Sequence, residues 1–403
     1  METSMNASRD LEFAIEWNRI MLQFLGIWPN SKNGGRTLDI RFLFAVFFML
    51  CLNASQIVYL IMVRGQLDLM IEVLAKAIAL TTTALLKLIS VWRNSKVLSS
   101  LLSDVIEDWM MPKSKQDREV MLKNAKVARM LSIGGISLIL VTLSIYVLNH
   151  VILDFLTRMR NVPDYERQLL YQAYFPFDTD KSPNYELTCV VQTVGAVYTA
   201  MSYSGIDTLI AMLVLHLCAQ FTNLQFALTN LVSEVECTKR MVFREQLATI
   251  VNKHKRLNRF AESIEKSFNA LLLVHMLFCT LQFCIIGYNF ISAIDSSANG
   301  RLSLYQFVFL TIYVISSVLQ LFVYCYVGEK LNNESTNLSY AAYQSEWYKL
   351  SVQETRDMMF VMLRAKAPMQ ITAGKFCSFS LVLFSDILKA SMGYLSVLLS
   401  VRD

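Results

Sequence analysis

The stretch "ITAGKFCSFSLVLFSDILKASMGYLSVLLSV", from Ile371 to Val401, decides what kind of molecule this chain forms. It is apolar over a length that suffices to cross a bilayer, because a spanning helix needs about 20 residues. Asp386 and Lys389 nevertheless lie inside it. An ionisable residue at the bilayer centre costs about 2.5–3.5 kcal/mol, so both are expected to face each other, a cavity or a polar path. The segment is therefore predicted either to pack through a salt bridge or to line a pore.

The composition of the whole chain is typical of a membrane protein. Of its 403 residues 54% are hydrophobic and 17% are charged, and the mean hydropathy is +0.41. These values favour one polytopic helical bundle over several soluble domains. The net charge of +5 does not indicate nucleic-acid binding, because the lysines and arginines lie mostly in the gaps between apolar segments.

Seven apolar segments are long enough to cross a bilayer as helices. In chain order these segments are 41–63, 69–91, 130–153, 190–215, 268–294, 304–327 and 371–401. The fold class predicted from them is an all-α membrane protein with seven transmembrane helices. All six prolines lie outside the seven segments, so unkinked helices are expected.

Lysine and arginine residues predict how the seven helices are oriented. The second and fourth gaps hold eight of them each, whereas the first and fifth gaps each hold one, Arg64 and Arg301. Basic residues concentrate on the cytoplasmic side of a membrane, so the N-terminus is predicted to be cytoplasmic and the C-terminus extracellular. This inverted topology argues against an ordinary G-protein-coupled receptor, whose seven helices require an extracellular N-terminus.

The sequence lacks the residue patterns that enzymes and metal sites require. It contains no Walker A, H-E-x-x-H or G-x-S-x-G motif. Its histidines lie on four different segments without the pairing typical of metal ligands, and they are His150, His216, His254 and His275. Neither an enzymatic activity nor a metal or other cofactor is therefore expected.

The outer halves of the predicted helices carry apolar, aromatic and hydroxyl-bearing residues that suit a small, mostly apolar ligand. These candidate ligand-binding residues are Ala79, Thr82, Thr83, Leu143, Tyr146, His150, Tyr198, Ser202, Phe309 and Tyr313. Core packing is the alternative for each of them taken singly. Glu72 and Lys76 are one helical turn apart, and they either satisfy each other or border the same cavity.

Four stretches of the chain resemble the ligand-specific odorant receptors of insects. They are "WNRIMLQFLGIWP" (Trp17–Pro29), "LHLCAQFTNLQFAL" (Leu215–Leu228), "IVNKHKRLNRFAESIEKSF" (Ile250–Phe268) and "APMQITAGKFCSFSLVLFSDILKASMGYLSVL" (Ala367–Leu398). The first three resemble the opening of that family's sequences, the lower end of its fourth helix and the approach to its fifth. The last resembles the family's C-terminal signature and is the specific one.

This resemblance implies a function, partners and a location. Receptors of this family form a non-selective cation channel that a small volatile odorant opens directly. Ligand-specific subunits join a shared co-receptor in a heterotetramer. The implied location is the plasma membrane, in contact with lipid, in the dendrite of an olfactory sensory neuron.

The resemblance also assigns residues of the last segment, which lines the pore in this family. Matched position by position, the pore-narrowing residues fall on Val397, Ser400 and Val401. Ser400 stands where the co-receptor has glutamine, and the co-receptor's long cytoplasmic insert is missing, which indicates a tuning subunit and not the co-receptor. Asp386 and Lys389 then hold the helix against its neighbours or border the ion path, and both interpretations stay open.

These expectations divide the chain into four parts. Residues 1–40 are predicted to be a cytoplasmic amphipathic segment. Residues 41–327 contain the first six transmembrane helices, with the odorant pocket in their outer half. Residues 328–370 carry apolar side chains at helical spacing and are predicted to form a cytoplasmic anchor helix region between subunits, with solvated helix ends as the alternative. Residues 371–403 are predicted to be the pore-lining last helix.

Two other functions remain as alternatives at this point. One is a seven-helix chemoreceptor that signals to cytoplasmic partners without a pore of its own. The other is a small-molecule transporter, against which the missing inverted repeat and the unbroken spans argue.

Overall fold

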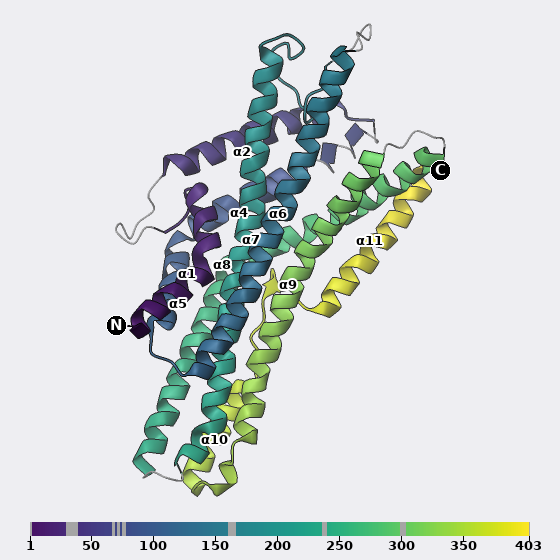
Figure 1. Cartoon of the computed structure of the whole chain (residues 1–403). Coiled ribbons are helices and arrows are strands. Elements are labelled where there is room, and N and C mark those ends of the chain that lie inside the picture. The colour runs from purple at the N-terminus through teal and green to yellow at the C-terminus, as the bar shows by residue number, and fades with distance from the viewer. Residues whose placement is uncertain are drawn as a thin grey trace.

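The computed structural model describes residues 2–29, 39–66, 69–70, 73–74, 78–159, 167–235, 240–298 and 304–402, and these are mainly helical (Figure 1). The helices are α1 (Glu2–Phe24), α2 (Ile40–Met62), α4 (Ala79–Arg93), α5 (Ser95–Met110), α6 (Lys115–Met159), α7 (Asn184–Val235), α8 (Arg240–Ala298), α9 (Leu304–Gln344), the 3-10 helix η2 (Trp347–Lys349), α10 (Val352–Ala365) and α11 (Leu381–Arg402). Two short strands, β1 (Thr372–Ala373) and β2 (Cys377–Ser378), form an antiparallel hairpin.

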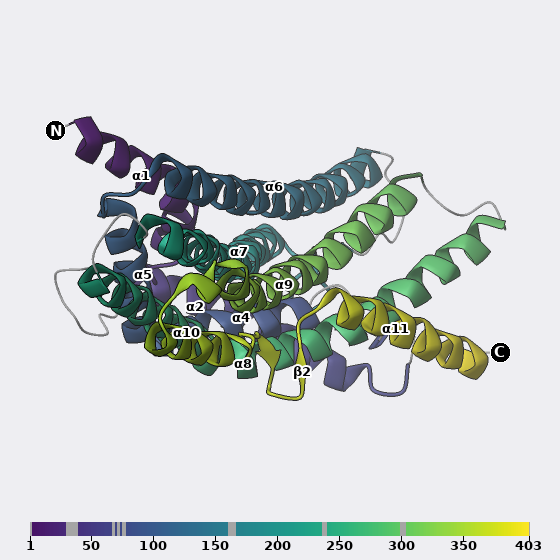
Figure 2. The ribbon, with the colours of Figure 1, turned by 90° about the horizontal axis from the view of Figure 1, so that it is seen from below.

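Helix α7 lies at the centre of the bundle. It packs against α2, α4, α6, α8 and α9, and Figure 2 shows α6 on one side of it and α8 with α11 on the other. The middle of α7, from Ile206 to Phe221, is mostly apolar and is buried on all sides. A helix that is apolar all round is stable where neighbours surround it, which explains its central position.

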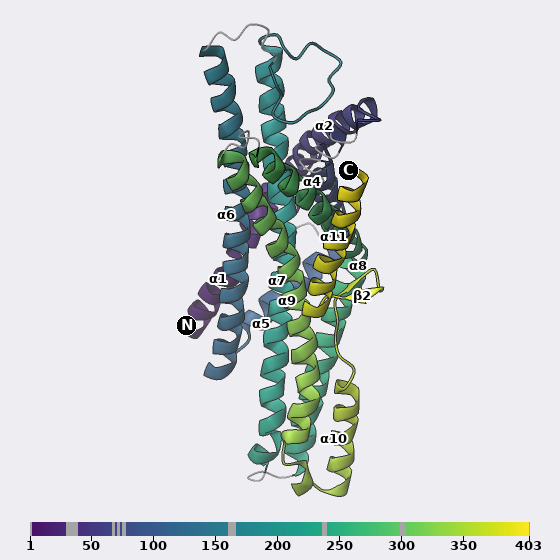
Figure 3. The ribbon, with the colours of Figure 1, turned by 90° about the vertical axis from the view of Figure 1, so that its right-hand side faces the viewer.

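The bundle has two distinct ends. At one end the loop of residues 167–183 leads into α7, and we call this the loop end (Figures 1 and 3). At the opposite end α10 lies beside the ends of α7 and α9, and we call this the α10 end (Figure 3). Helix α11 runs from the middle of the bundle towards the loop end and packs on α8 and α9.

Five helices of the described part are long and apolar enough to cross a membrane, and they cover residues 40–62, 115–159, 184–232, 242–289 and 307–349. They correspond to the first, third, fourth, fifth and sixth predicted spans. The predicted second span, 69–91, includes positions outside the described residues, among them Glu72 and Lys76, and its described remainder leads into α4.

The predicted seventh span differs from the structure at its beginning. Residues 371–380 are not helical, and α11 begins at Leu381. The two strands of the hairpin pair there, with Thr372 opposite Ser378. A short apolar run is compatible with a strand or a helix, so hydropathy alone places the start of this helix too early.

Three contacts hold the hairpin against α8. The Thr372 amide donates to Glu265 Oε2 at 2.9 Å, and the Thr372 hydroxyl donates to the other oxygen of that carboxylate. The Gly374 amide donates to the carbonyl of Asn269 at 2.9 Å.

Gly374 has a φ of +59°, and a Cβ added there would lie 2.6 Å from a methyl group of Leu273. The turn therefore requires glycine at this position.

Capping residues in the sequence set where α10 and α11 begin. Ser351 and Glu354 form a capping box at the start of α10, in which the Ser351 amide donates to Glu354 Oε2 at 3.0 Å. Before α11, the Ser380 hydroxyl accepts a hydrogen bond from the Leu383 amide at 3.1 Å. Each cap satisfies a backbone amide that has no partner inside its own helix.

The first helix packs onto the bundle as an integral part of it. Arg129 of α6 donates to the Glu16 carboxylate at 3.2 Å and to the Phe13 carbonyl at 3.1 Å. The Thr208 hydroxyl of α7 donates to the Asn18 side-chain oxygen at 3.1 Å. These contacts fix α1 (Glu2–Phe24) against α6 and α7.

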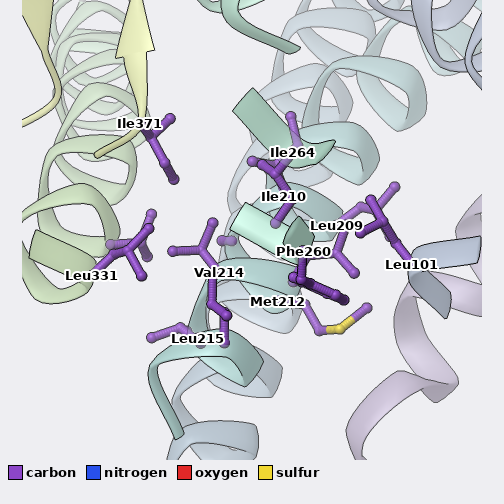
Figure 4. Close-up of a cluster of buried hydrophobic side chains, with 14 of the residues drawn as sticks. Leu101, Leu209, Ile210, Met212, Val214, Leu215, Phe260, Ile264, Leu331 and Ile371 are labelled. Atoms are coloured by element: carbon purple, nitrogen blue, oxygen red, sulfur yellow. The ribbon is translucent and has the colours of Figure 1, made fainter. Parts of the chain in front are cut away.

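The apolar core lies where α5, α7, α8 and α9 meet. Figure 4 shows part of it, and its labelled side chains are all buried: Leu101, Leu209, Ile210, Met212, Val214, Leu215, Phe260, Ile264, Leu331 and Ile371. Removing one such leucine or isoleucine side chain typically costs about 2–5 kcal/mol. The core therefore fixes α7, α8 and α9 relative to one another, and with them the walls of the site described next.

Candidate functional site

A cavity of about 100 Å³ lies between the helices near the loop end. Its apolar lining residues are Leu52, Leu80, Ile139, Leu143, Ala196, Ala200 and Phe309. Its polar lining residues are Thr81, Thr142, Tyr146, Tyr171, Thr199, Gln282, Tyr313, Ser316, Ser317 and Gln320. None of these lining residues carries a charge, so the site suits an uncharged molecule with a mainly apolar surface.

A row of aromatic rings lines the cavity. The ring centroids of Tyr171 and Tyr146 are 5.3 Å apart, those of Tyr146 and Phe309 are 5.5 Å apart, and those of Phe309 and Tyr313 are 6.1 Å apart. Aromatic pairs at such separations attract one another beyond the gain from burial. The row thus joins α6 and α9 to the loop of residues 167–183.

Several polar side chains around the cavity already have partners. Gln282 donates from Nε2 to the Tyr313 hydroxyl at 2.9 Å and to the Ser317 hydroxyl at 3.1 Å. The hydroxyls of Thr142 and Thr199 each donate at 2.8 Å to the carbonyl four residues earlier in their own helix. Such internal bonds leave these threonines with a reduced capacity to donate to a ligand.

Three of the hydrogen bonds that hold the loop of residues 167–183 lie at Leu170 and Tyr171, beside the cavity. The Tyr171 amide donates to Gln192 Oε1 at 3.1 Å, and Gln192 Nε2 donates to the Tyr171 carbonyl at 2.8 Å. The Tyr146 hydroxyl donates to the Leu170 carbonyl at 2.7 Å. Gln192 is only 1% exposed, so the loop is held by a side chain that belongs to the interior of the bundle.

The structure brings four of the ten predicted ligand-binding residues together in the cavity lining: Leu143, Tyr146, Phe309 and Tyr313. The other six lie outside the lining, and they are Ala79, Thr82, Thr83, His150, Tyr198 and Ser202. Leu143 and Tyr146 come from α6, and Phe309 and Tyr313 come from α9. Their spacings place each pair on one face of its helix.

The predicted residues on α4 form hydrogen bonds within their helix or with a neighbouring helix. The Thr83 hydroxyl donates to the Ala79 carbonyl at 2.7 Å, and Thr82 accepts a hydrogen bond from Asn53 of α2 at 2.9 Å. Ser202 donates to a carbonyl of α4 at 3.0 Å. Thr82 and Ser202 thus join α4 to α2 and α7, whereas Thr83 bonds within its own helix.

Tyr198 and His150 pack elsewhere. The ring of Tyr198 stacks on Phe24 and Phe48, at centroid distances of 5.2 and 6.1 Å. His150 Nε2 lies 3.3 Å from the Tyr185 hydroxyl. The contact of Tyr198 with Phe24 depends on how α1 packs on the bundle, and the contact of His150 depends on how α6 packs against the start of α7. The helical spacing within one segment predicts neither contact.

Thirteen of the seventeen lining residues are absent from the sequence-based set, among them Tyr171, Gln282 and Ser317. Gln282 is a polar residue inside an apolar span, and this is a signal that does mark interior-facing positions in membrane helices. Tyr171 lies in the loop, whose path over the cavity depends on the Gln192 contact and has no local sequence signal.

A buried ion pair lies on the α10 side of the cavity. Lys87 Nζ of α4 and Asp207 Oδ1 of α7 are 2.5 Å apart, and their side chains are 0% and 7% exposed. The Tyr324 hydroxyl donates to the same carboxylate oxygen, and Lys87 Nζ lies 3.7 Å from the centre of the Tyr203 ring. The pair is 120 positions apart in the chain, so no local sequence pattern links the two residues.

Helix α11 packs one face against the bundle and exposes the opposite face. The face packed on α8 and α9 includes Ile387, Ser391 and Leu395. Asp386 and Lys389 lie on the exposed face, and neither forms a salt bridge or hydrogen bond with another residue that the structure describes.

The predicted pore-narrowing residues lie near the end of α11. Val397 is 62% exposed. The side chains of Ser400 and Val401 lie outside the part of the chain whose side chains are described. Val397 therefore belongs to the face of α11 that is turned away from α8 and α9.

These observations define a class of protein. Membrane-spanning helices surround an uncharged cavity, and within the described ranges no group of three or more His, Cys, Asp or Glu side chains is placed to hold a metal ion. The molecule is thus a multi-pass helical membrane protein with an internal cavity whose lining suits a small uncharged molecule.

The chain belongs to the family described as 7tm Odorant receptor, whose model matches residues 66–392. This is a family of receptors and not of enzymes. The chain is 26% identical over 245 residues to Odorant receptor 13a of Drosophila melanogaster, a match that spans 57% of each chain. It therefore covers little more than half the length of that relative.

Two further relatives extend the comparison. Odorant receptor 22c of Drosophila melanogaster is 23% identical over 394 residues, which span 94% of this chain and 95% of the relative. The odorant receptor coreceptor of Aedes aegypti is 28% identical over 164 residues, which span 41% of this chain and 33% of the coreceptor.

Solved structures share the fold. The insect olfactory receptor OR5 from Machilis hrabei superposes with a TM-score of 0.80 at 16% identity, and the match covers 96% of this chain and 97% of that one. A structure of the same receptor in complex with eugenol matches equally well. The fold is therefore the seven-helix fold of insect odorant receptors, as the sequence predicts.

Proposed function

We propose that this chain is the odorant-binding subunit of a heteromeric, odorant-gated, non-selective cation channel in the plasma membrane of an olfactory sensory neuron's dendrite. The observation that carries the proposal is the small uncharged cavity near the loop end. It occurs in a fold shared with an insect olfactory receptor solved in complex with eugenol. A small volatile odorant matches such a cavity, because it offers mainly apolar surface and few polar groups.

In this proposal the loop end faces the outside and the α10 end faces the cytoplasm. Residues 92–129 and 216–267 support this orientation, because they are rich in lysine and arginine and include the parts of α6, α7 and α8 that lie away from the loop end (Figure 1). Basic residues favour the cytoplasmic side. Odorant then reaches the cavity from the outer side of the membrane.

We propose further that the exposed face of α11 lines the pore. Asp386, Lys389 and Val397 are all exposed on that face. Polar side chains at membrane depth require a partner or a watery path. The pore is narrowest at Val397, Ser400 and Val401, near the outer end of the helix.

The proposed partner is a co-receptor subunit, which joins this chain in a tetramer. Helix α10 supports a contact between subunits, because apolar side chains are exposed on it: Val352 at 81%, Met359 at 58%, Phe360 at 66% and Leu363 at 70%. Exposed apolar patches of this kind mark interaction surfaces. Residues 328–370 thus form the proposed anchor between subunits.

The energy available from one cavity limits how the channel opens. Shifting a closed state from about 1:99 to 99:1 requires roughly 5.5 kcal/mol of differential binding. A ligand that buries about 200 Å² of apolar surface gains at most about 5 kcal/mol in total, and only the part that differs between states contributes. We therefore expect partial opening by one odorant, or full opening only when several subunits are occupied.

Filling the cavity tests the odorant-binding role. Ala200→Leu places a larger side chain in a space of about 100 Å³, so we expect the effective odorant concentration to rise at least about tenfold, a change of roughly 1.4 kcal/mol. The measurement is the current evoked by a panel of volatile odorants in cells that express this chain with a co-receptor.

Leu148→Ala is the matched control, because Leu148 is 59% exposed on α6 and does not line the cavity. It should leave the odorant response unchanged. Unaltered responses of Ala200→Leu at normal surface expression would exclude the cavity as the odorant site. Wild-type complexes at the cell surface that pass no current with any odorant would exclude the channel function itself.

A further inference from the structure

Two polar groups of the cavity lining have no hydrogen-bond partner among the described residues: the hydroxyl of Tyr171 and the side-chain amide of Gln320. They lie at opposite ends of the cavity. Tyr171 stacks at the loop end, in the row that continues to Phe309, whereas Gln320 lies three helical turns further along α9. Three turns place the backbones of Phe309 and Gln320 roughly 16 Å apart, so we expect a small ligand held beside Phe309 and Tyr171 not to reach Gln320.

The backbone and the ring of Tyr171 are held in place by contacts that do not involve its hydroxyl. Gln192 holds both backbone groups of Tyr171, at 3.1 and 2.8 Å, and the ring stacks on Tyr146. The neighbouring carbonyl of Leu170 accepts from the Tyr146 hydroxyl. A donor that is held in place before binding costs little entropy when a ligand arrives.

The chemistry of this donor restricts the ligand. Burial raises the pKa of the Tyr171 phenol, so the hydroxyl stays protonated and neutral at physiological pH. An uncharged donor in an uncharged cavity pairs best with a neutral oxygen acceptor. A carboxylate or an ammonium ion would have to leave water without a countercharge, which is far more costly.

We propose that Tyr171 determines the specificity of the cavity, because its hydroxyl donates a hydrogen bond to the carbonyl or ether oxygen of a small neutral ligand. This inference rests on the proposed function, in which the cavity is the odorant site. The volume of about 100 Å³ is below the roughly 150 Å³ of a cavity that holds benzene. A single six-membered ring is therefore the largest apolar body that we expect for the ligand, and it fits only if the lining side chains shift outward.

Cyclohexanone and methylenecyclohexane test this inference, because they have the same shape and differ only in whether the exocyclic atom is an oxygen acceptor. We expect Tyr171→Phe to raise the effective concentration of cyclohexanone about tenfold, which corresponds to roughly 1.4 kcal/mol. Methylenecyclohexane should change by less than about twofold. The measurement is the ratio of the two effective concentrations in cells that express the chain with a co-receptor.

Three variants serve as controls. Tyr174→Phe removes a hydroxyl from the same loop at a residue that is 43% exposed and lies outside the lining, and it should leave the ratio unchanged. Gln192→Met removes both backbone contacts of Tyr171 and should reduce the preference for the ketone, with no further reduction when Tyr171→Phe is added. Gln320→Leu should leave the ratio unchanged.

Each result bears on a definite claim. If Tyr171→Phe leaves the ratio unchanged, or if Gln320→Leu changes it instead, Tyr171 does not have the proposed role. The proposed function itself still holds in that case, provided that odorants evoke a current. A response to other volatiles but not to cyclohexanone overturns the ligand class. Current that no volatile evokes from wild-type complexes at the cell surface overturns the proposed function, and this inference with it.

Discussion

At the scale of single residues, the buried ion pair of Lys87 and Asp207 is expected to have a large effect on stability. Their charges lie in the interior of the bundle at 2.5 Å from each other, and one oxygen of Asp207 has no further partner among the described residues. Lys87→Met should cost about 3–5 kcal/mol, because it leaves the buried carboxylate unpaired. Thermal unfolding of the detergent-solubilised protein measures this loss.

The double variant Lys87→Met with Asp207→Leu should regain most of the stability, since replacing both charges with apolar groups is often neutral. Glu12→Gln is a control at the exposed pair of Glu12 and Arg19, which are 60% and 39% exposed, and it should cost less than about 1 kcal/mol. If the double variant is as unstable as Lys87→Met alone, the ion pair is not the cause of the loss.

The sequence allowed part of the cavity lining to be predicted. Leu143 and Tyr146 lie three residues apart, and Phe309 and Tyr313 lie four apart, so each pair had to share a helix face. Tyr198 has the same residue chemistry but packs on Phe24 of α1. Which face of a membrane helix meets which neighbour is decided by packing between distant segments, and one segment's spacing does not contain that information.

At the scale of elements, the hairpin between α10 and α11 is the part that hydropathy does not predict. Gly374 holds its turn with a φ of +59° in close contact with Leu273. Gly374→Ala should therefore destabilise the protein by about 1–3 kcal/mol, through backbone strain and the crowded Cβ. The melting temperature of the solubilised protein should fall accordingly.

Gly134→Ala provides the comparison, because Gly134 lies in α6 and a Cβ there meets nothing within 4 Å. Alanine favours a helix over glycine by up to about 1 kcal/mol, so this variant should be neutral or more stable. A Gly374→Ala protein that melts like the wild type would show that the turn tolerates a side chain.

The long helices, in contrast to the hairpin, could be predicted from the sequence. A run of about 20 consecutive apolar residues is long enough to cross a bilayer as a helix.

At the scale of the whole molecule, the exposed face of α11 provides a test that distinguishes a channel subunit from a receptor without a pore. Val397 is on that face at 62% exposure, whereas Ser391 on the same helix is 5% exposed and packs towards α8. If four subunits surround a pore, a thiol at position 397 meets water and ions. A thiol at position 391 does not.

A cationic, membrane-impermeant methanethiosulfonate reagent distinguishes these two positions in complexes with a co-receptor. Val397→Cys should lose most of its odorant-evoked current after treatment, because the added positive charge repels cations in the narrow part of the pore. Ser391→Cys and the wild type, with its native cysteines, should keep theirs. Equal loss in all three would assign the effect to a native cysteine. An unchanged current in Val397→Cys, at confirmed labelling of the thiol, would place the ion path elsewhere and favour a receptor that signals without its own pore.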